Sequence, residues 1–294
     1  MFSLFVRGGK ESRRMKKKLL CTLLSSLLIL LLICPWQSGW PAAAAQGGEP
    51  PEHPSGSEPA RETSSREAKE KRKEQQILTL GQLIKKYPET FKIHGPRVKE
   101  VALTFDDVPD PRFTPQILDV LKAHHIKATF FVMGSRAKKH PELVERIVRE
   151  GHVIGNHSYN HPVFHKLEMD EYVAEIKRTE NTLYGIVGYK PKLIRPPYGD
   201  ITERQLRWAK QQGYKIVNWN VDSLDWKGIG KEAVKRNVLS TVGQGSIILQ
   251  HAGGGTTSNL SGTIDALPDI IRTLKNKGYS FVTLPRLLHV PKDK

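Results

Sequence analysis

Two adjacent aspartates, Asp106 and Asp107, stand at the end of an apolar segment that is predicted to be a β-strand. Neighbouring carboxylates repel each other unless a cation or a proton lies between them. His157 and His161 follow about fifty residues later with the spacing i, i+4, which places both imidazoles on one face of a helix, where they can bind one metal ion. One carboxylate and two imidazoles can ligate a catalytic zinc ion and leave a position open for water. These residues therefore predict a metal site.

Alternating strands and helices must bring these residues together. Repeated β-α units imply a parallel sheet. Seven strands suggest a closed or nearly closed barrel, in which functional groups lie at the C-terminal ends of the strands. Arg195, Asp222 and His251 also fall at such ends, so we expect them to face the same site. The predicted strands are 101–106, 128–133, 152–156, 192–195, 215–221, 246–250 and 280–283, and the predicted helices are 114–124, 141–150, 170–187, 202–212, 231–242 and 264–277.

Five stretches carry most of these residues. They are Thr104-Phe105-Asp106-Asp107, His157-Ser158-Tyr159-Asn160-His161, Arg195-Pro196-Pro197-Tyr198-Gly199, Asp222-Ser223-Leu224-Asp225-Trp226 and Leu249-Gln250-His251. In this order they resemble the motifs of polysaccharide deacetylases with a NodB-homology domain, carbohydrate esterase family 4, and the resemblance covers about residues 99–288. It implies a distorted (β/α) barrel, one divalent metal ion and hydrolysis of N-acetyl groups on sugars. Zinc is the first choice of metal, with cobalt or nickel as alternatives.

The resemblance also implies a role for each residue on the metal side of the site. Asp107, His157 and His161 would be the metal ligands. Asp106 would be the general base that accepts a proton from the attacking water. Arg195 would keep Asp106 ionised and aligned.

The other matched residues would act on the leaving group and on the acetyl group. His251 would be the general acid that protonates the leaving amine, and Asp225 would orient His251 and keep it cationic. The backbone N–H of Tyr198 would bind the oxyanion that forms during the attack. Trp226 and Leu249 would form an apolar wall around the acetyl methyl group.

Each of these residues has an ordinary alternative when it is taken singly. A lone histidine is more often a plain polar residue than a ligand, Trp226 could be a core residue, and Asp222 could cap its loop, so Asp222 is assigned no catalytic role. The family usually has glycine after the two aspartates, where this chain has Val108. A β-branched residue disfavours positive φ, so either the turn needs no glycine or the loop is shifted.

The beginning of the chain has the features of an export signal. A basic cluster at 13–18 precedes an apolar run at 19–34, and alanines before Gln46 suit cleavage by signal peptidase. Residues 1–45 are therefore predicted to be a signal peptide or an N-terminal membrane anchor. Both cysteines of the chain lie in this apolar run, so the remaining chain forms no disulfide bond.

The predicted domain follows two polar segments. Residues 46–76 are rich in Pro, Gly, Ser and charged residues, which predicts a disordered linker. Residues 77–98 are transitional and include a short amphipathic helix with Leu80, Leu83 and Ile84. Residues 99–294 are predicted to form the deacetylase domain.

The net charge of +16 indicates an anionic partner or a solvated basic surface without one. No nucleic-acid motif occurs, so an anionic cell-wall or membrane surface is the expected partner, and the oligomeric state is left open.

The combined prediction is an exported, metal-dependent hydrolase that removes acetyl groups from N-acetylglucosamine residues of a polysaccharide. Peptidoglycan is the first choice of substrate and chitin oligosaccharides are the second. The alternatives are an O-acetyl xylan esterase and a non-catalytic wall-binding protein that retains the barrel. A metallopeptidase lacks support because the chain has no His-Glu-x-x-His motif.

Overall fold

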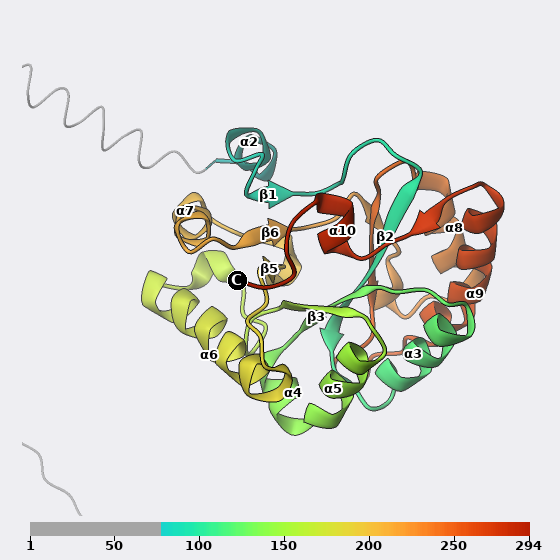
Figure 1. The fold of residues 1–294 in the computed structure, drawn as a ribbon, viewed down its shortest axis with the longest axis horizontal. Helices are drawn as coiled ribbons and strands as arrows, with labels where there is room; N and C mark the ends of the chain where they lie inside the picture. The colour runs from blue at the N-terminus through green and yellow to red at the C-terminus, as the bar shows by residue number, and fades with distance from the viewer. Residues whose placement is uncertain (1–77) are drawn as a thin grey trace, which may run out of the picture. The chain divides into compact units, whose positions relative to one another are not determined.

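The computed structural model describes residues 78–294 (Figure 1). The predicted signal segment and the predicted linker lie outside the described residues. In the described part of the chain, no helix is long and apolar enough to span a membrane.

One parallel sheet organises the described residues. The strand order is β1-β6-β5-β4-β3-β2-β8-β7, and β9 pairs with β2. The strands are β1 (Phe91–Lys92), β2 (Glu100–Val108), β3 (Thr129–Val132), β4 (Val153–Asn156), β5 (Leu193–Ile194), β6 (Lys215–Val217), β7 (Val221–Asp222), β8 (Ile247–His251) and β9 (Ser280–Phe281). The α-helices are α2 (Leu80–Lys86), α3 (Thr114–Ala123), α4 (Gly134–Lys139), α5 (Pro141–Arg149), α6 (Met169–Val187), α7 (Glu203–Gln211), α8 (Lys231–Thr241), α9 (Ser261–Asn276) and α10 (Leu284–Leu288), and the 3-10 helices are η1 (Phe164–Lys166), η2 (Pro197–Gly199) and η3 (Asp225–Lys227).

The sheet is a curled half-barrel whose two ends are bridged by one short connection. The single strand predicted at 215–221 is in fact two strands, because β6 pairs with β1 and β5 whereas β7 pairs with β8. Between them, the Asn218 N–H donates to the carbonyl oxygen of Lys92 and the Asn220 N–H donates to that of Ile247. The chain therefore crosses from one end of the sheet to the other between β6 and β7. These two strands do not pair with each other, so the barrel stays open there.

The other predicted strands and all six predicted helices are present within a few residues of their expected bounds. The short helix expected around Leu83 is also confirmed: α2 begins after a capping box of Thr79 and Gln82 and buries Leu83. The structure adds α4, α10 and β1, which were not predicted, and β1 joins the sheet from the segment that was expected to be transitional.

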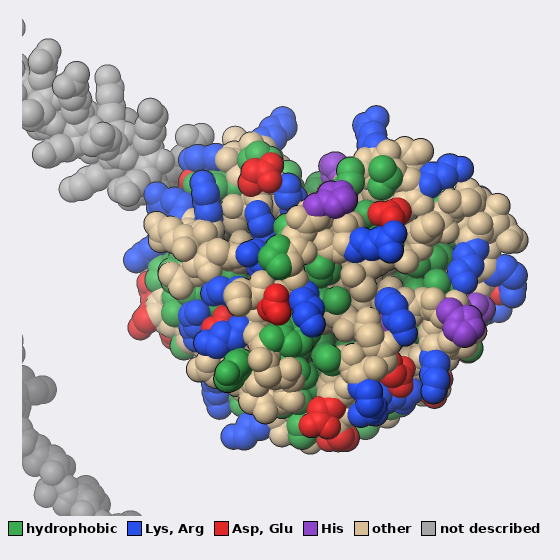
Figure 2. All heavy atoms as spheres, viewed as in Figure 1, with side chains coloured by type: hydrophobic (Ala, Val, Ile, Leu, Met, Phe, Trp, Pro, Cys, Tyr) green, Lys and Arg blue, Asp and Glu red, His purple; other side chains and the backbone are tan. Residues whose placement is uncertain are grey.

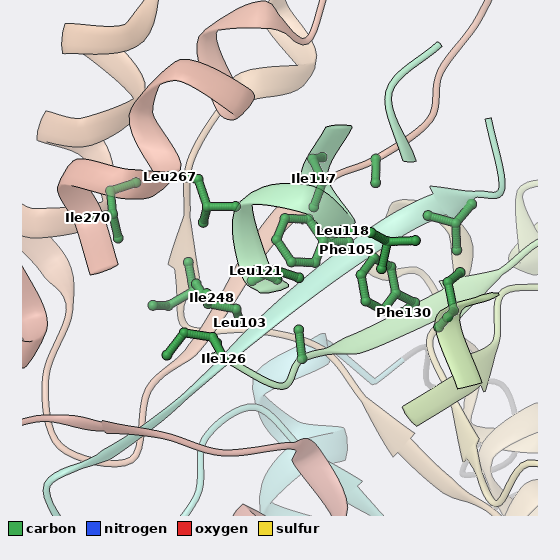
Figure 3. Packing of buried hydrophobic residues seen from close by; sticks show 14 of the residues in the cluster. Leu103, Phe105, Ile117, Leu118, Leu121, Ile126, Phe130, Ile248, Leu267 and Ile270 are labelled. Atoms are coloured by element: carbon green, nitrogen blue, oxygen red, sulfur yellow. The ribbon is translucent and has the colours of Figure 1, made fainter. Parts of the chain in front are cut away.

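The alternation of side chains along β2 separates the outer core from the inside of the half-barrel. Leu103 and Phe105 point outward and pack against Leu118 of α3 and Leu267 of α9 in the cluster shown in Figure 3. Burying each such side chain stabilises the fold by about 1.5–3 kcal/mol. Thr104, which lies between them, faces the opposite side, as the period of two in a strand requires.

Basic side chains are spread over the surface. Figure 2 shows Lys and Arg across the face that carries α10 and the C-terminus, with fewer Asp and Glu between them. This distribution agrees with the excess of 46 basic over 30 acidic residues in the sequence.

Candidate active site

An irregularity in β2 lets two adjacent carboxylates face one cavity. In a regular strand, successive side chains point to opposite faces. Here the register between β2 and β3 shifts between Phe105 and Val108, and Asp107 has a φ of 63°. A bulge of this kind redirects a side chain, and aspartate tolerates the left-handed conformation better than most residues. Asp106 and Asp107 therefore line the same cavity.

A fully buried arginine holds Asp106. Arg195 Nη1 donates to Asp106 Oδ1 and to Thr104 Oγ1, each at 2.8 Å. Its Nε donates to the carbonyl oxygen of Val217, and its Nη2 donates to that of Asn218. A buried charge is costly unless it is paired and hydrogen-bonded, and this network satisfies both charges. The carboxylate of Asp106 is thereby held in one orientation at the end of β2.

The two motif histidines lie in a loop after β4, so the prediction that they share a helical face is wrong. His157 follows the last residue of β4, and Ser158 and His161 both have a φ of 62°. The Tyr159 N–H donates to Glu175 Oε2 of α6 at 2.8 Å, and the His161 N–H donates to Ser158 Oγ at 3.0 Å. This tight loop brings the two imidazole rings to 4.9 Å between centroids, which a helical turn was expected to do.

Asp107, His157 and His161 bring three donor atoms together in a way that suits a metal ion. Asp107 Oδ1 lies 3.5 Å from His157 Nε2 and 3.3 Å from His161 Nε2. These separations match the roughly 3.4 Å between ligands of a tetrahedral zinc ion with bonds of about 2.0–2.2 Å. Asp107 Oδ1 is buried without a hydrogen-bond partner, as expected for an atom whose partner is a cation. His157 Nδ1 lies 2.7 Å from the carbonyl oxygen of Arg195, which places the proton on Nδ1 and leaves Nε2 free to coordinate.

A second histidine environment lies across the cavity. His251 is the last residue of β8, and its Nδ1 lies 2.8 Å from Asp225 Oδ1. Asp225 Oδ2 accepts hydrogen bonds from the His251 backbone N–H at 2.8 Å and from Thr263 Oγ1 at 2.6 Å. Asp225 is almost completely buried, so its charge is compensated mainly by His251.

The two sides differ in the charge that they favour on histidine. Burial lowers the pKa of His161 to about 4, and the neighbouring His157 adds to the shift. Burial also opposes protonation of His251, but the charge and hydrogen bond of Asp225 outweigh it and raise the pKa of His251 to about 9. The neutral imidazole can donate a lone pair, whereas the cationic one can donate a proton.

One cavity of about 540 Å³ contains most of the predicted site. Arg195 and Asp225 do not line it; both are buried behind it, where they hold Asp106 and His251. The predicted residues that line the cavity are Asp106, Asp107, His157, His161, Tyr198, Trp226, Leu249 and His251.

Two aromatic residues are unusually open to solvent at this cavity. Tyr198 has a φ of 60° and its side chain is 67% exposed, with its ring 4.7 Å from that of His161. Trp226 is 54% exposed, so it is not a core residue. Asp222 also lines the cavity, and its Oδ1 accepts from the Leu224 N–H at 2.8 Å, which is the loop-capping contact expected for it.

Arg136 is the main site residue that the sequence analysis missed. It lies in α4, directly after β3, and it lines the cavity. Its Nη1 donates to the carbonyl oxygen of Asp107 at 3.0 Å, and its Nη2 donates to that of Gly254 at 2.6 Å. The position after a predicted strand end was the available signal, but α4 itself was not predicted. Met133 and Trp219 also line the cavity and were missed, because both lie in predicted strand segments that no motif marks.

Val108 adopts an ordinary backbone conformation. Its φ is not positive. Its side chain is fully buried in the outer core, and the residue pairs with Val132 of β3. The left-handed position is Asp107 instead. The turn after the two aspartates therefore needs no glycine at position 108.

The fold and the site define a class of proteins. The family described as polysaccharide deacetylase matches residues 94–217. The chain is also 51% identical over 212 residues to a peptidoglycan-N-acetylglucosamine deacetylase of Bacillus cereus, covering 72% of this chain and 76% of that protein. The chain therefore belongs to the polysaccharide deacetylase family, carbohydrate esterase family 4, whose deacetylases are metal-dependent.

The chain is also similar to a solved structure and to a second curated protein of the family. A crystal structure of the Bc1960 peptidoglycan N-acetylglucosamine deacetylase is 50% identical, with a TM-score of 0.71, and the match covers 74% of this chain and all of that one. The peptidoglycan-N-acetylmuramic acid deacetylase PdaC of Bacillus subtilis is 40% identical over 199 residues, which is 68% of this chain but only 41% of that protein.

Proposed function

We propose that this protein hydrolyses the N-acetyl groups of N-acetylglucosamine residues in peptidoglycan, with chitin oligosaccharides as the second choice of substrate. The observation that carries the proposal is the juxtaposition, in one cavity, of the Asp107, His157 and His161 donors with Asp106 and His251. The name and the 51% identity of the Bacillus cereus relative support the choice of polymer.

The three donors would hold one divalent cation, and we propose zinc because one carboxylate and two imidazoles suit it. Such an ion, when bound, polarises the amide carbonyl and lowers the pKa of a water molecule from its bulk value towards about 7. Cobalt and nickel accept similar ligands and are the alternatives.

The protein's own residues would move the protons. Asp106, held by Arg195, would accept a proton from the attacking water as the carbon–oxygen bond forms. His251, kept cationic by Asp225, would donate its Nε2 proton to the nitrogen as the carbon–nitrogen bond breaks. Asp106 would thus accept the proton lost by water on one side of the cavity, and His251 would supply the proton gained by the amine on the opposite side. The products would be acetate and a free amino sugar.

The remaining predicted residues would position the substrate. The backbone N–H of Tyr198 would donate to the oxyanion, and Trp226 and Leu249 would surround the acetyl methyl group. Leu249 is only 3% exposed, so the apolar wall that it offers is deep in the cavity. We also propose that the protein is exported, on the strength of the basic and apolar runs at its N-terminus.

The test is acetate release by the purified protein from peptidoglycan, N-acetylglucosamine oligosaccharides and acetylated xylan, each with zinc, cobalt or nickel supplied. We expect release from the first two substrates and little from xylan. Preferential release from xylan would identify an esterase. A protein that binds peptidoglycan but releases no acetate with any metal would support the non-catalytic alternative instead.

A further inference from the structure

A second cavity, of about 1000 Å³, lies beside the catalytic one. The two cavities share Tyr198, whose side chain is two-thirds exposed. The second cavity extends from Tyr198 along the first residues of α7 to Leu78 and Leu80 at the start of α2. Helices α2 and α7 lie side by side there in Figure 1 and are joined by an ion pair of 2.7 Å between Lys86 and Glu203.

The carboxylates of this second cavity already have cationic or hydrogen-bonding partners. Asp200 Oδ2 accepts from the His165 backbone N–H and lies 2.8 Å from His165 Nδ1. Glu203 pairs with Lys86 and also accepts a hydrogen bond from the Tyr87 hydroxyl. Both acids therefore have close partners already, although Glu203 also lies near enough to Arg207 for the positive charge of Arg207 to help lower the pKa of Glu203.

Two arginines of the second cavity lack such partners. Arg204 and Arg207 are exposed, line the cavity and form no ion pair or side-chain hydrogen bond with any other described residue of 78–294. They are three residues apart on α7, so they lie on one face of the helix. The guanidinium group binds carboxylates through two parallel hydrogen bonds. Leu80, which is 42% exposed, adds an apolar surface on the other side of the cavity.

We infer that the second cavity binds a sugar that carries a carboxylate, in a chain whose neighbouring N-acetylated sugar occupies the catalytic cavity. This inference rests on the proposed deacetylase function and narrows its substrate to an acidic glycan. Tyr198 and Leu80 offer surface for the apolar faces of the ring, and Arg204 and Arg207 bind the acid. A neutral chain of N-acetylglucosamine has no group that these arginines prefer, so they act on affinity for acidic chains rather than on the chemical step.

The test compares substrates of equal length with and without carboxylates. One is the neutral N-acetylglucosamine tetramer, and the other alternates N-acetylglucosamine with N-acetylmuramic acid. The double variant Arg204→Gln/Arg207→Gln should raise KM for the acidic chain by about 5- to 20-fold at low salt, the loss expected for charged hydrogen bonds. Its kcat on the acidic chain and both constants on the neutral chain should not change.

Two sources of carboxylate are separated by using the acidic chain with and without its attached peptides. In the peptide-bearing form the carboxyl group of N-acetylmuramic acid is converted to an amide, so the sugar itself carries a free carboxylate only in the peptide-free form. A KM effect that is larger on the peptide-free form assigns the acid to the sugar, and an equal or larger effect on the peptide-bearing form contradicts the inference as stated. The control variant Arg97→Gln/Arg149→Gln removes the same charge from exposed arginines that line neither cavity, and it should leave KM within about twofold.

A binding measurement keeps this inference separate from the proposed function. Calorimetric titration of the Asp106→Asn variant with each chain should show weaker binding of the acidic chain after the two arginines are replaced. Equal affinities before and after that replacement would overturn the inference, even if wild type releases acetate. Conversely, absence of acetate release with intact arginine-dependent binding would refute the deacetylase activity alone.

Discussion

The two sides of the catalytic cavity use the same residue type in opposite ways. On one side, His161 stands beside His157 and a half-buried aspartate, and burial lowers the pKa of His161 to about 4. On the other side, His251 stands against the almost fully buried Asp225, whose charge outweighs the effect of burial and raises the pKa of His251 to about 9. One imidazole is thus kept neutral at pH 7 and the other is kept cationic.

The difference shows that the groups around each histidine decide whether its imidazole is neutral or cationic at pH 7. Both histidines are shielded from water, which by itself disfavours the charged form. Only His251 receives a dedicated carboxylate that is held by further hydrogen bonds, from Thr263 and from the His251 backbone. Environments that push the pKa values of like groups apart are the usual basis for separate ligand and acid roles in one site.

The largest expected effect comes from breaking the metal side. His161→Ala removes one of the three donors, so we expect the purified variant to lose its metal and its acetate release to fall to background. Elemental analysis and circular dichroism would measure metal content and folding. His124→Ala, at the end of α3 and outside the cavity, is the matched control and should retain the metal. Unchanged metal content in His161→Ala would contradict the assignment of this ligand.

Replacing the base should separate proton transfer from metal binding. Asp106→Asn keeps the shape of the side chain and its contact with Arg195 but removes the basic oxygen. We expect retained metal and a loss in kcat of about 10²–10⁴-fold, the usual contribution of general acid–base catalysis. Turnover near that of wild type would show that Asp106 is not the base.

A smaller, pH-dependent effect should come from the acid side. The acid must be protonated to act, so activity should fall as the pH rises through the pKa of His251, about 9. Asp225→Asn removes the charge that raises this pKa, and the alkaline limb of kcat/KM should move roughly 2 pH units towards acid. Thr263→Val removes only one hydrogen bond to Asp225 and should move it less. An alkaline limb that stays in place in Asp225→Asn would rule out His251 as the titrating acid.

The smallest effect on catalysis is expected at Val108, which adjoins the metal side but points away from it. Val108→Gly removes a fully buried side chain from the outer core, so the free energy of unfolding should fall by about 2–4 kcal/mol. The rate should change by less than about threefold, because Asp107 already carries the left-handed conformation. Thermal unfolding and acetate release would measure the two effects. A large gain in rate would instead mean that Val108 obstructs the native site.

Much of this molecule could be predicted from its sequence. Alternating apolar strands and amphipathic helices, punctuated by glycines, gave the order and type of most elements, because these patterns depend on local periodicity. The five motifs likewise contained the eight predicted residues that line the cavity, whereas Arg136, Met133 and Trp219 lie outside the motifs and were missed. Gly188 illustrates the local signals: it ends α6 with a φ of 76°, which glycine adopts without strain.

What only the tertiary structure decided are the features that depend on partners distant in sequence. The i, i+4 spacing of His157 and His161 predicted a helix, but contacts with Glu175 of α6 fold the segment into a loop. The break between β6 and β7 exists because the strands on either side of it pair with opposite ends of the sheet. Both aspartates face one cavity because a bulge interrupts β2. No periodicity encodes these outcomes, since each is set by hydrogen bonds between segments that meet only after the chain has folded.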